Sequence, residues 1–268
     1  MTYKITIIVL DWNGGEDTIK CLDSLEKIED NNFNVLVVDN NSKIKPTDYL
    51  KIKFPDFKYL ELNKNYGYSL GNNIGFEYIK DDCDFVCFLN NDVVVSHNFI
   101  SNFRVAIDKY GENNIYGPKI FFEYPSKIIW YGGGIVDLKK GLIFHKNLGK
   151  KDNRILIKEE FTNYVTGCCL LISTENFQKL NGFDSRFNMY AEDVDLCLRA
   201  KKHEIKSVFI PTAVIWHKVS SSLGGRYSIK KSLKKIKSIK KLLKIHEPNL
   251  NSTFYTIKSV LNIILPKN

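Results

Sequence analysis

The sequence predicts an α/β fold in which a mainly parallel sheet is flanked by helices and is followed by an amphipathic helical tail. Apolar runs alternate with segments of helical periodicity up to about Pro118, a pattern typical of a parallel sheet covered on both faces. The chain has 268 residues, 44% of them hydrophobic, so it can bury one sizeable core. Residues 223–268 differ, because many lysines there accompany one apolar stripe.

The first part of the chain contains predicted strands and helices in alternation. The strands are expected at Ile5–Leu10, Asn34–Val38, Phe57–Leu62 and Phe85–Leu89. The helices are expected at Asp17–Ile28, Leu70–Lys80 and Phe99–Tyr110. Right-handed crossovers would place Leu10, Asp39 and Asn90 along one edge of the sheet. Ligands of open α/β sheets bind at the carboxyl ends of the strands, so this edge is where we look for a site.

Asn90-Asn91-Asp92 follows the apolar run Phe85–Leu89, where a buried strand would end. A carboxylate at this position can bind a hard divalent cation, and the cation can bind a diphosphate. An ordinary turn is the alternative, because Asn and Asp are also common turn residues. The triplet alone does not decide between them.

Asp39 ends the second predicted strand and precedes Asn40-Asn41-Ser42. An acid there can accept a hydrogen bond from a ribose hydroxyl or a base N–H group, and a cap or turn is the alternative. In the Asn/Gly-rich segment 63–75, free N–H groups at a helix start near Ser69 would suit a phosphate or a ribose. An ordinary loop is again the alternative, since the chain has neither a P-loop nor the dinucleotide fingerprint.

Glu192, Asp193 and Asp195 lie in the first turn of a predicted helix. The helix dipole favours acids there, so a capping role is one interpretation. A carboxylate held beside a hydroxyl is also what a general base requires. Asp195 and Arg199 are four residues apart and could pair on the helix surface, which would leave Glu192 and Asp193 facing a cleft.

His217 ends another strand-like apolar run. A lone histidine there is usually structural, but together with Asp92 its imidazole could complete a Mn²⁺ or Mg²⁺ site. The segment Trp130–Gly134 predicts a hairpin turn, with close approach of a sugar or a diphosphate to the glycines as the alternative.

Composition and charge restrict the classes of protein. The six cysteines lack zinc-site spacing, so we expect reduced core thiols in a cytosolic protein. The start has no signal-peptide pattern, and no apolar run approaches the roughly 20 residues of a membrane span. Eight lysines between residues 230 and 244 account for nearly all of the net charge of +9. Basic charge confined to one segment argues against a nucleic-acid partner.

The tail predicts two amphipathic helices. In residues 229–245 most lysines lie opposite an apolar stripe of Ile229, Leu233, Ile236, Ile239 and Leu243. Such a helix suits an anionic membrane surface, and packing of the stripe on the main domain is the alternative. A second short helix is expected after Pro248, with Phe254, Ile257, Val260, Leu261 and Ile264 on one side.

Taken together, these segments resemble glycosyltransferase family 2, the inverting enzymes of the GT-A fold, and within it the rhamnosyltransferase-like branch. The resemblance covers about residues 5–220, and the order and spacing of short motifs make it specific. Those motifs are Ile7–Gly14, Val37–Ser42, Asn65–Gly67, Gly71–Gly75, Asn90–Asp92, Thr166–Ile172, Gly182–Asp184 and Glu192–Arg199. The resemblance implies a Rossmann-like GT-A domain at 1–222, with a nucleotide-sugar-binding half at 1–118 and an acceptor half at 119–222, followed by the tail at 223–268.

The resemblance also implies roles for single residues. Asp39 would bind the base or ribose of the donor, and Asp92 and His217 would bind Mn²⁺ or Mg²⁺. Asp193 would be the general base, with Glu192 the less favoured choice. The other donor-binding residues would be Trp12, Asn13, Asn65, Gly67, Gly71, Asn72, Asn90 and Asn91. Asn90 stands where the family has the first acid of its D-x-D motif, which lowers the negative charge and puts strict metal dependence in question.

The expected activity is transfer of a sugar from dTDP-L-rhamnose or a UDP-sugar to a glycan or lipid-linked acceptor in cell-surface polysaccharide synthesis. The expected location is cytoplasmic, with peripheral contact to the inner face of the membrane as an option. Two rivals are weaker. A sugar-nucleotide nucleotidyltransferase would need a basic Gly-rich loop after the first strand, whereas Asp11–Glu16 contains no base. A nucleic-acid-binding protein rests on the lysine run alone.

Overall fold

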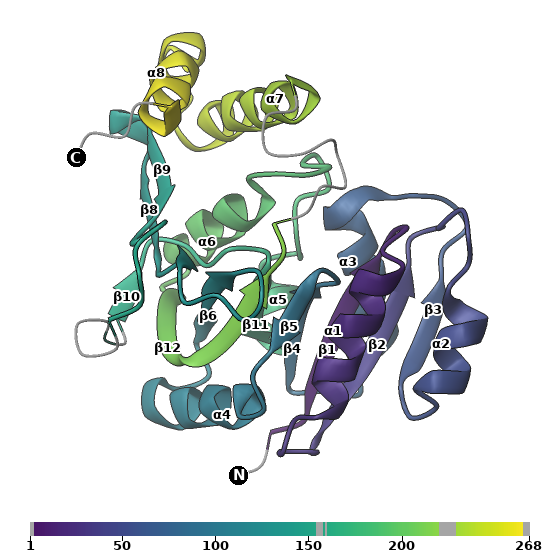
Figure 1. The fold of residues 1–268 in the computed structure, drawn as a ribbon. Helices are drawn as coiled ribbons and strands as arrows, with labels where there is room; N and C mark the ends of the chain where they lie inside the picture. The colour runs from purple at the N-terminus through teal and green to yellow at the C-terminus, as the bar shows by residue number, and fades with distance from the viewer. Residues whose placement is uncertain (1–2, 154–157, 159, 220–228, 265–268) are drawn as a thin grey trace.

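The computed structural model describes residues 3–153, 158, 160–219 and 229–264. Its centre is a ten-stranded sheet of order β10-β12-β6-β11-β4-β1-β2-β3, with β5 paired to β12 and β7 paired to β6 (Figure 1). The strands are β1 (Ile5–Asp11), β2 (Phe33–Asp39), β3 (Lys58–Glu61), β4 (Phe85–Asn90), β5 (Val93–Val95), β6 (Asn114–Phe122), β7 (Ile129–Tyr131), β10 (Glu160–Thr162), β11 (Cys169–Ser173) and β12 (Lys206–His217). Strands β1 to β4 are parallel, and β11 runs antiparallel between β4 and β6. The predicted α/β class with a mixed, mainly parallel sheet is confirmed.

Helices cover both faces of this sheet because side chains alternate along its strands. Ile7 of β1 points to the core beneath α1 (Glu16–Glu26), α2 (Thr47–Lys53) and α4 (Phe99–Tyr110). Ile8, the next residue, points to the opposite core beneath α3 (Gly67–Ile79), α5 (Thr174–Lys179) and α6 (Glu192–Lys202). The six cysteines are all free and buried, as predicted.

The predicted strands and helices of the first part of the chain are confirmed to within three residues at each end. Helix α2 was not predicted, because it buries only Thr47 and Leu50 and is too short for a clear helical period. It also missed β5, because this three-residue strand depends on pairing with β12. The predicted division at residue 118 falls within the continuous strand β6.

The predicted hairpin turn at Trp130–Gly134 is wrong. Gly132 and Gly133 join β7 of the main sheet to β8 (Gly134–Asp137), which pairs with β9 (Leu142–His145) in a separate two-stranded sheet. The turn of that hairpin is instead the short 3₁₀ helix η1 (Leu138–Lys140). The glycine run thus redirects the chain out of the main sheet.

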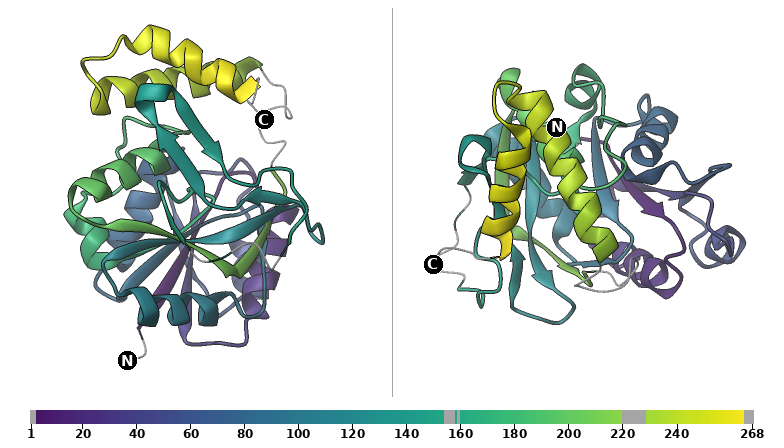
Figure 2. Two further views of the ribbon diagram at one scale, coloured as in Figure 1. Left: turned by 90° about the vertical axis from the view of Figure 1, so that its left-hand side faces the viewer. Right: turned by 90° about the horizontal axis from the view of Figure 1, so that it is seen from above.

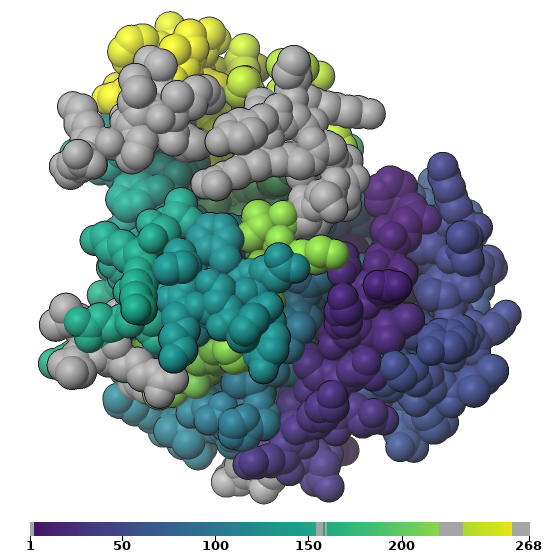
Figure 3. Space-filling view, in the orientation of Figure 1, coloured from purple at the N-terminus to yellow at the C-terminus, as the bar shows by residue number. Residues whose placement is uncertain are grey.

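The tail consists of α7 (Ile229–His246) and α8 (Ser252–Ile264), which contact each other. Both lie over the end of the molecule that carries α6 and the β8–β9 hairpin (Figure 2), and they form the top of the face seen in Figure 3. Ile239, Leu242 and Leu243 of α7 are buried in the core that also contains residues of α6. Packing on the main domain is therefore confirmed for this part of the stripe, whereas Leu233 is 54% exposed. None of the helices in the described ranges has the length and hydropathy needed to cross a membrane.

Candidate active site

The carboxyl ends of β1, β2 and β4 meet at one edge of the sheet, as the sequence predicted. The register of the parallel strands places Asp11 beside Asp39 and Leu10 beside Asn90. Asp11 and Asp39 are both buried. Buried carboxylates require partners, so the surroundings of these two acids indicate what the edge can bind.

Asp11 is the centre of a buried network that joins the loops after β1, β2 and β4. Its Oδ1 accepts hydrogen bonds from Thr18 Oγ1 at 2.5 Å, Asn91 Nδ2 at 2.8 Å and Gly14 N at 3.1 Å. Its Oδ2 accepts one from Ser42 Oγ at 3.1 Å. Gly14 has to be glycine, because a Cβ would stand 2.0 Å from Asn91 Nδ2. The amide nitrogen of Asn91 is thus used to hold the loops together, and its contact with a donor stays a prediction.

Asp39 has an oxygen available for a ligand. Its Oδ1 accepts a hydrogen bond from Ser42 N at 2.9 Å, whereas its buried Oδ2 has no partner among the described residues. A buried polar atom without a partner is costly, and a base N–H or ribose hydroxyl would supply one. Trp12, 44% exposed, and Asn13, whose backbone N donates to Ser42 Oγ at 2.8 Å, lie in the adjoining loop.

The predicted Asn/Gly loop leads into α3 and touches the loop before α6. Asn65 Oδ1 accepts a hydrogen bond from Gly67 N at 2.8 Å. Gly67 has a φ of 76°, and a Cβ there would stand 2.9 Å from Asn188 O. Gly71 and Asn72 serve the packing of α3, since a Cβ on Gly71 would stand 2.9 Å from a β1 side chain and Asn72 is only 1% exposed. Their predicted donor contacts stay predictions.

Strand β12 brings His217 to Asp92, because β12 pairs antiparallel with β5 and places His217 opposite Val93. His217 Nε2 lies 3.2 Å from Asp92 Oδ1, and both side chains are 9% exposed. His217 Nδ1 is buried without a partner in the part of the chain that the structure describes. Trp130 packs edge-on against the imidazole, with ring centroids 4.6 Å apart. The structure thus brings Asp92 and His217 together, and their binding of a metal stays a prediction.

The Asp92–His217 pair fits a divalent cation that also binds a diphosphate. A carboxylate oxygen and an imidazole nitrogen are both metal ligands. No third His, Cys, Asp or Glu joins them within the described ranges. Phosphate oxygens and water would then supply the other ligands, as is usual where a cation binds together with its nucleotide substrate.

Glu192 and Asp193 form a buried pair of acids at the start of α6. Asp193 Oδ2 accepts a hydrogen bond from Gly167 N and Asp193 Oδ1 one from Val194 N, both at 2.8 Å. Burial raises the pKa of Asp193, and these N–H groups act against the rise. Burial, and then the charge of Asp193, raise the pKa of Glu192 well above its usual range, and Glu192 Oε2 has no partner among the described residues. Burial therefore raises the pKa of both acids, and the N–H groups of Gly167 and Val194 stabilise the charged form of Asp193.

The segment Gly167-Cys168 connects these acids to the end of β4. Gly167 N donates to Asp193, and Cys168 O accepts a hydrogen bond from Asn90 N at 2.9 Å. Burial raises the pKa of the Cys168 thiol, and the charges of Asp92 and Asp193 raise it further. Gly167-Cys168 thus links Asp193 to the strand end that precedes Asp92, and the joint action of the predicted base and the predicted metal ligands stays a prediction.

Sequence reasoning missed several residues of this site. Asp11 was noticed only as part of a motif, although an acid at the tip of the first strand was a usable signal. The Tyr68 hydroxyl donates to Gly167 O, and burial, followed by the charges of Glu192 and Asp193, raises the pKa of Tyr68 well above its usual range. Tyr68 lies in the predicted Asn/Gly segment and Trp130 begins the glycine segment, but no local pattern indicates that the fold brings them to the acids and to His217.

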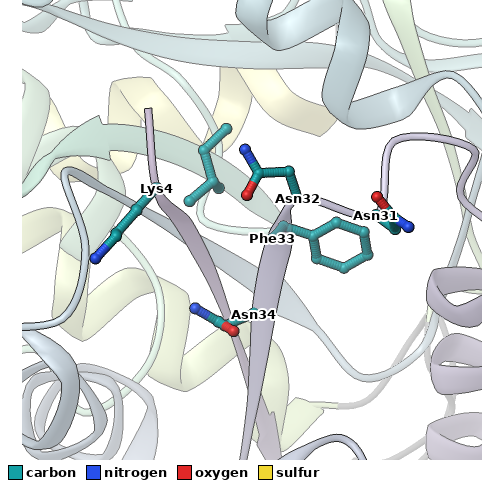
Figure 4. A pocket seen from close by; sticks show the side chains of 6 residues that line it. Lys4, Asn31, Asn32, Phe33 and Asn34 are labelled. Atoms are coloured by element: carbon teal, nitrogen blue, oxygen red, sulfur yellow. The ribbon is translucent and has the colours of Figure 1, made fainter. Parts of the chain in front are cut away.

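A separate shallow pocket lies at the opposite, amino-terminal ends of β1 and β2 (Figure 4). It contains none of the predicted site residues. Its lining consists of Lys4, Ile5, Asn31, Asn32, Phe33 and Asn34.

Comparison with known families decides the class of this site. The family described as glycosyl transferase family 2 matches residues 6–180, which is more than half of the chain. The chain belongs to glycosyltransferase family 2. It is a glycosyltransferase of the hexosyltransferase class, with a nucleotide-sugar donor and a place in cell-surface polysaccharide synthesis. The N-terminal domain of galactosyltransferase also matches, at residues 153–232.

Curated relatives of this family 2 enzyme include rhamnosyltransferases. Rhamnosyltransferase WbbL of Escherichia coli is 25% identical over 218 residues, which cover 76% of this chain and 80% of that protein. The N-acetylglucosaminyl-diphospho-decaprenol L-rhamnosyltransferase of Mycobacterium tuberculosis is 25% identical over 244 residues, covering 84% of this chain and 79% of that protein. The similarity supports the rhamnosyltransferase-like branch.

Solved structures confirm the GT-A fold. GalNAc-T7, crystallised with UDP, GalNAc and Mn²⁺, superposes with a TM-score of 0.70 at 15% identity over 91% of this chain. The family 2 enzyme spans about half of that longer chain, 48%. Residues 1–349 of S. aureus TarS in complex with UDP superpose with a TM-score of 0.61 at 15% identity, covering 98% of this chain and 72% of that one. The Mn²⁺ of the first structure suggests use of a divalent metal in this fold.

Proposed function

We propose that the chain is an inverting transferase that moves a sugar from dTDP-L-rhamnose or a UDP-sugar to a hydroxyl of a glycan or lipid-linked acceptor. One observation carries the proposal. Gly167 N donates a hydrogen bond to Asp193, and Cys168 O accepts one from Asn90 at the end of β4. The proposed base and the strand end that would bind the diphosphate therefore both contact one short segment. The similar TarS structures contain UDP or UDP-GlcNAc, and the similar mycobacterial enzyme is an N-acetylglucosaminyl-diphospho-decaprenol L-rhamnosyltransferase. These similarities support this class of donor and acceptor.

The donor would bind along the strand ends. Asp39 Oδ2 would accept a hydrogen bond from the base or the ribose, which gives this buried oxygen the partner it needs. Trp12, Asn13, Asn65 and Gly67 would line the nucleotide, with Gly71, Asn72, Asn90 and Asn91 supporting their loops. Asp92 and His217 would hold a Mn²⁺ or Mg²⁺ ion. When bound, the ion would stabilise the negative charge that develops on the leaving diphosphate.

Asp193 would take the proton of the attacking hydroxyl. Its two backbone hydrogen bonds keep it ionised and fixed in direction. The hydroxyl oxygen then attacks the anomeric carbon from the face opposite the diphosphate, which inverts that carbon. Glu192, protonated beside it, would donate a hydrogen bond to the sugar acceptor and not compete as a base.

We further propose that α7 holds the enzyme at the inner face of an anionic membrane, where a lipid-linked acceptor would lie. Lys234, Lys235 and Lys237 are exposed, and each lysine near such a surface contributes about 1 kcal/mol. Because Ile239 and Leu243 are buried against the main domain, the contact would be electrostatic and would not insert this part of the stripe. Co-sedimentation with phosphatidylserine vesicles at low salt tests it. Equal sedimentation of wild type and K234E/K237E would refute it.

The experiment that tests the donor class is a thermal-shift series with dTDP, UDP and duplex DNA, each with and without Mn²⁺. Ligands of the native state raise the Tm in proportion to their binding free energy. We expect a rise with dTDP or UDP that Mn²⁺ increases, and none with DNA. A rise with DNA alone would contradict the proposed function.

A further inference from the structure

We propose that His246, the last residue of α7, is a positioning residue for the catalytic carboxylates, which makes the tail a working part of the transferase. The inference rests on the proposed role of Asp193. His246 would act by holding α6 in place, although it lies 53 positions after Asp193 in the chain.

Asp195 is the link between the tail and α6. It is fully buried and lies in the first turn of α6, two residues after Asp193. Its Oδ2 accepts a hydrogen bond from Arg199 Nε at 2.8 Å, and its Oδ1 one from His246 Nε2, also at 2.8 Å. The predicted Asp195–Arg199 pair is thus present, but its predicted place on the helix surface is wrong, because Asp195 is buried beneath the tail. The His246 side chain is 4% exposed. The two carboxylate oxygens are thus shared between a partner on the same helix and a partner on the tail.

Arg199 alone does not fix the direction of this carboxylate. Its guanidinium also donates to Leu180 O and, at 2.9 Å, to Gly182 O, so it is held to the chain before α6. Without His246, Asp195 Oδ1 would lose its hydrogen-bond donor although the residue is fully buried. A buried carboxylate responds by rotating or by drawing in water, and either response moves the first turn of α6. That turn carries Glu192 and Asp193.

The loop before α6 depends on the same helix. Tyr190 and Ala191, which lead directly into Glu192, have φ values of 72° and 68°. Non-glycine residues adopt this region only when their surroundings hold them there. On α7, Ser238 Oγ donates to Met189 O at 3.1 Å and Lys241 Nζ donates to Arg186 O.

Helix α7 therefore holds both sides of the point where α6 begins. The loop contacts described above lie on one side, and the His246–Asp195 contact lies on the other. A displacement of about 1 Å at a reacting group can reduce a rate about 100-fold. His246 is the residue through which this effect can be separated from simple packing, because it makes a defined hydrogen bond to Asp195 of α6 that a glutamine can replace and a leucine cannot.

The test compares His246→Leu, which removes the donor, with His246→Gln, whose amide can donate to Asp195. Lys244→Ala, at an exposed position of the same helix, is the matched control. We expect His246→Leu to lower kcat about 10- to 100-fold while the KM for the nucleotide-sugar stays within twofold of wild type. His246→Gln should recover most of the rate, and Lys244→Ala should behave as wild type. A kcat that His246→Leu leaves unchanged below its Tm would overturn the inference.

Hydrogen exchange of the full-length variants separates this inference from the proposed function. In His246→Leu, exchange should accelerate in peptides covering 186–199 and stay unchanged in peptides of β1 and β2, whether or not the correct donor is known. Unchanged exchange at 186–199 would refute the positioning role even in an active enzyme. Faster exchange there in a protein that transfers no sugar would refute only the proposed function.

Discussion

Replacing Asp11 by Ala is the sharpest test of how the strand edge is built. The substitution removes the acceptor of four hydrogen bonds, from Thr18, Asn91, Gly14 and Ser42. At a net value of about 1 kcal/mol each, they amount to about 4 kcal/mol. For a chain of this size, about 2–4 °C of Tm per kcal/mol converts that loss to roughly 8–16 °C. Asp11→Asn keeps one of the two side-chain oxygens as an acceptor, so the free energy of unfolding should fall by only about 1–2 kcal/mol.

Urea unfolding and differential scanning calorimetry would measure the loss, with the exposed Asp56→Ala as the matched control. Because the loops of Trp12 and Ser42 depend on Asp11, nucleotide binding should weaken in Asp11→Asn at temperatures where the protein is folded. If Asp11→Ala unfolds within 2 °C of wild type, the network does not hold the edge together and the reasoning is wrong.

Three further outcomes concern the site itself. Asp92→Asn should abolish the part of the UDP or dTDP thermal shift that depends on Mn²⁺, and an unchanged shift would argue against Asp92 as a ligand. Because burial raises the pKa of Asp193, the transfer rate should fall as the pH drops through a value above the ordinary aspartate pKa of about 3.9; an acid limb at or below that value contradicts an ionised Asp193 base. Folded Glu192 binds its proton more tightly than the unfolded chain does, so stability is lost as the pH rises through its raised pKa. Glu192→Gln should therefore have a higher Tm than wild type at pH 8, and a lower one would contradict the raised pKa of Glu192.

The sequence was sufficient for the parts of the fold that repeat a simple pattern. Buried strands such as Phe85–Leu89 are recognisable as apolar runs, and the right-handed connection of parallel strands predicts that Leu10, Asp39 and Asn90 lie on one edge of the sheet. The Asp195–Arg199 pair followed from helical spacing alone. The sequence suggested that Asp92 and His217 act together. The pairing of β12 with β5 is what brings the two side chains together.

The features that the sequence did not predict depend on contacts between distant segments. The glycines after Tyr131 look like a hairpin turn, but whether β7 and β8 pair depends on their other neighbours, β6 and β9. The sequence of the lysine-rich helix could not show that Ile239, Leu242 and Leu243 pack in the core, because the side chains that cover them come from distant segments. His246 gives no local signal, because its role depends on Asp195, 51 residues away.

The central claim is that Asp193 activates a hydroxyl for inverting sugar transfer from a nucleotide-sugar. The most direct measurement incubates the enzyme with dTDP-L-rhamnose or UDP-sugars and an N-acetylglucosaminyl diphospholipid analogue, and determines the product by mass spectrometry and its anomeric configuration by NMR. We expect a product of inverted configuration with wild type, and a rate about 100- to 10,000-fold lower with Asp193→Asn, which still binds the nucleotide. Near-normal turnover by Asp193→Asn, or retention of configuration, would contradict the account.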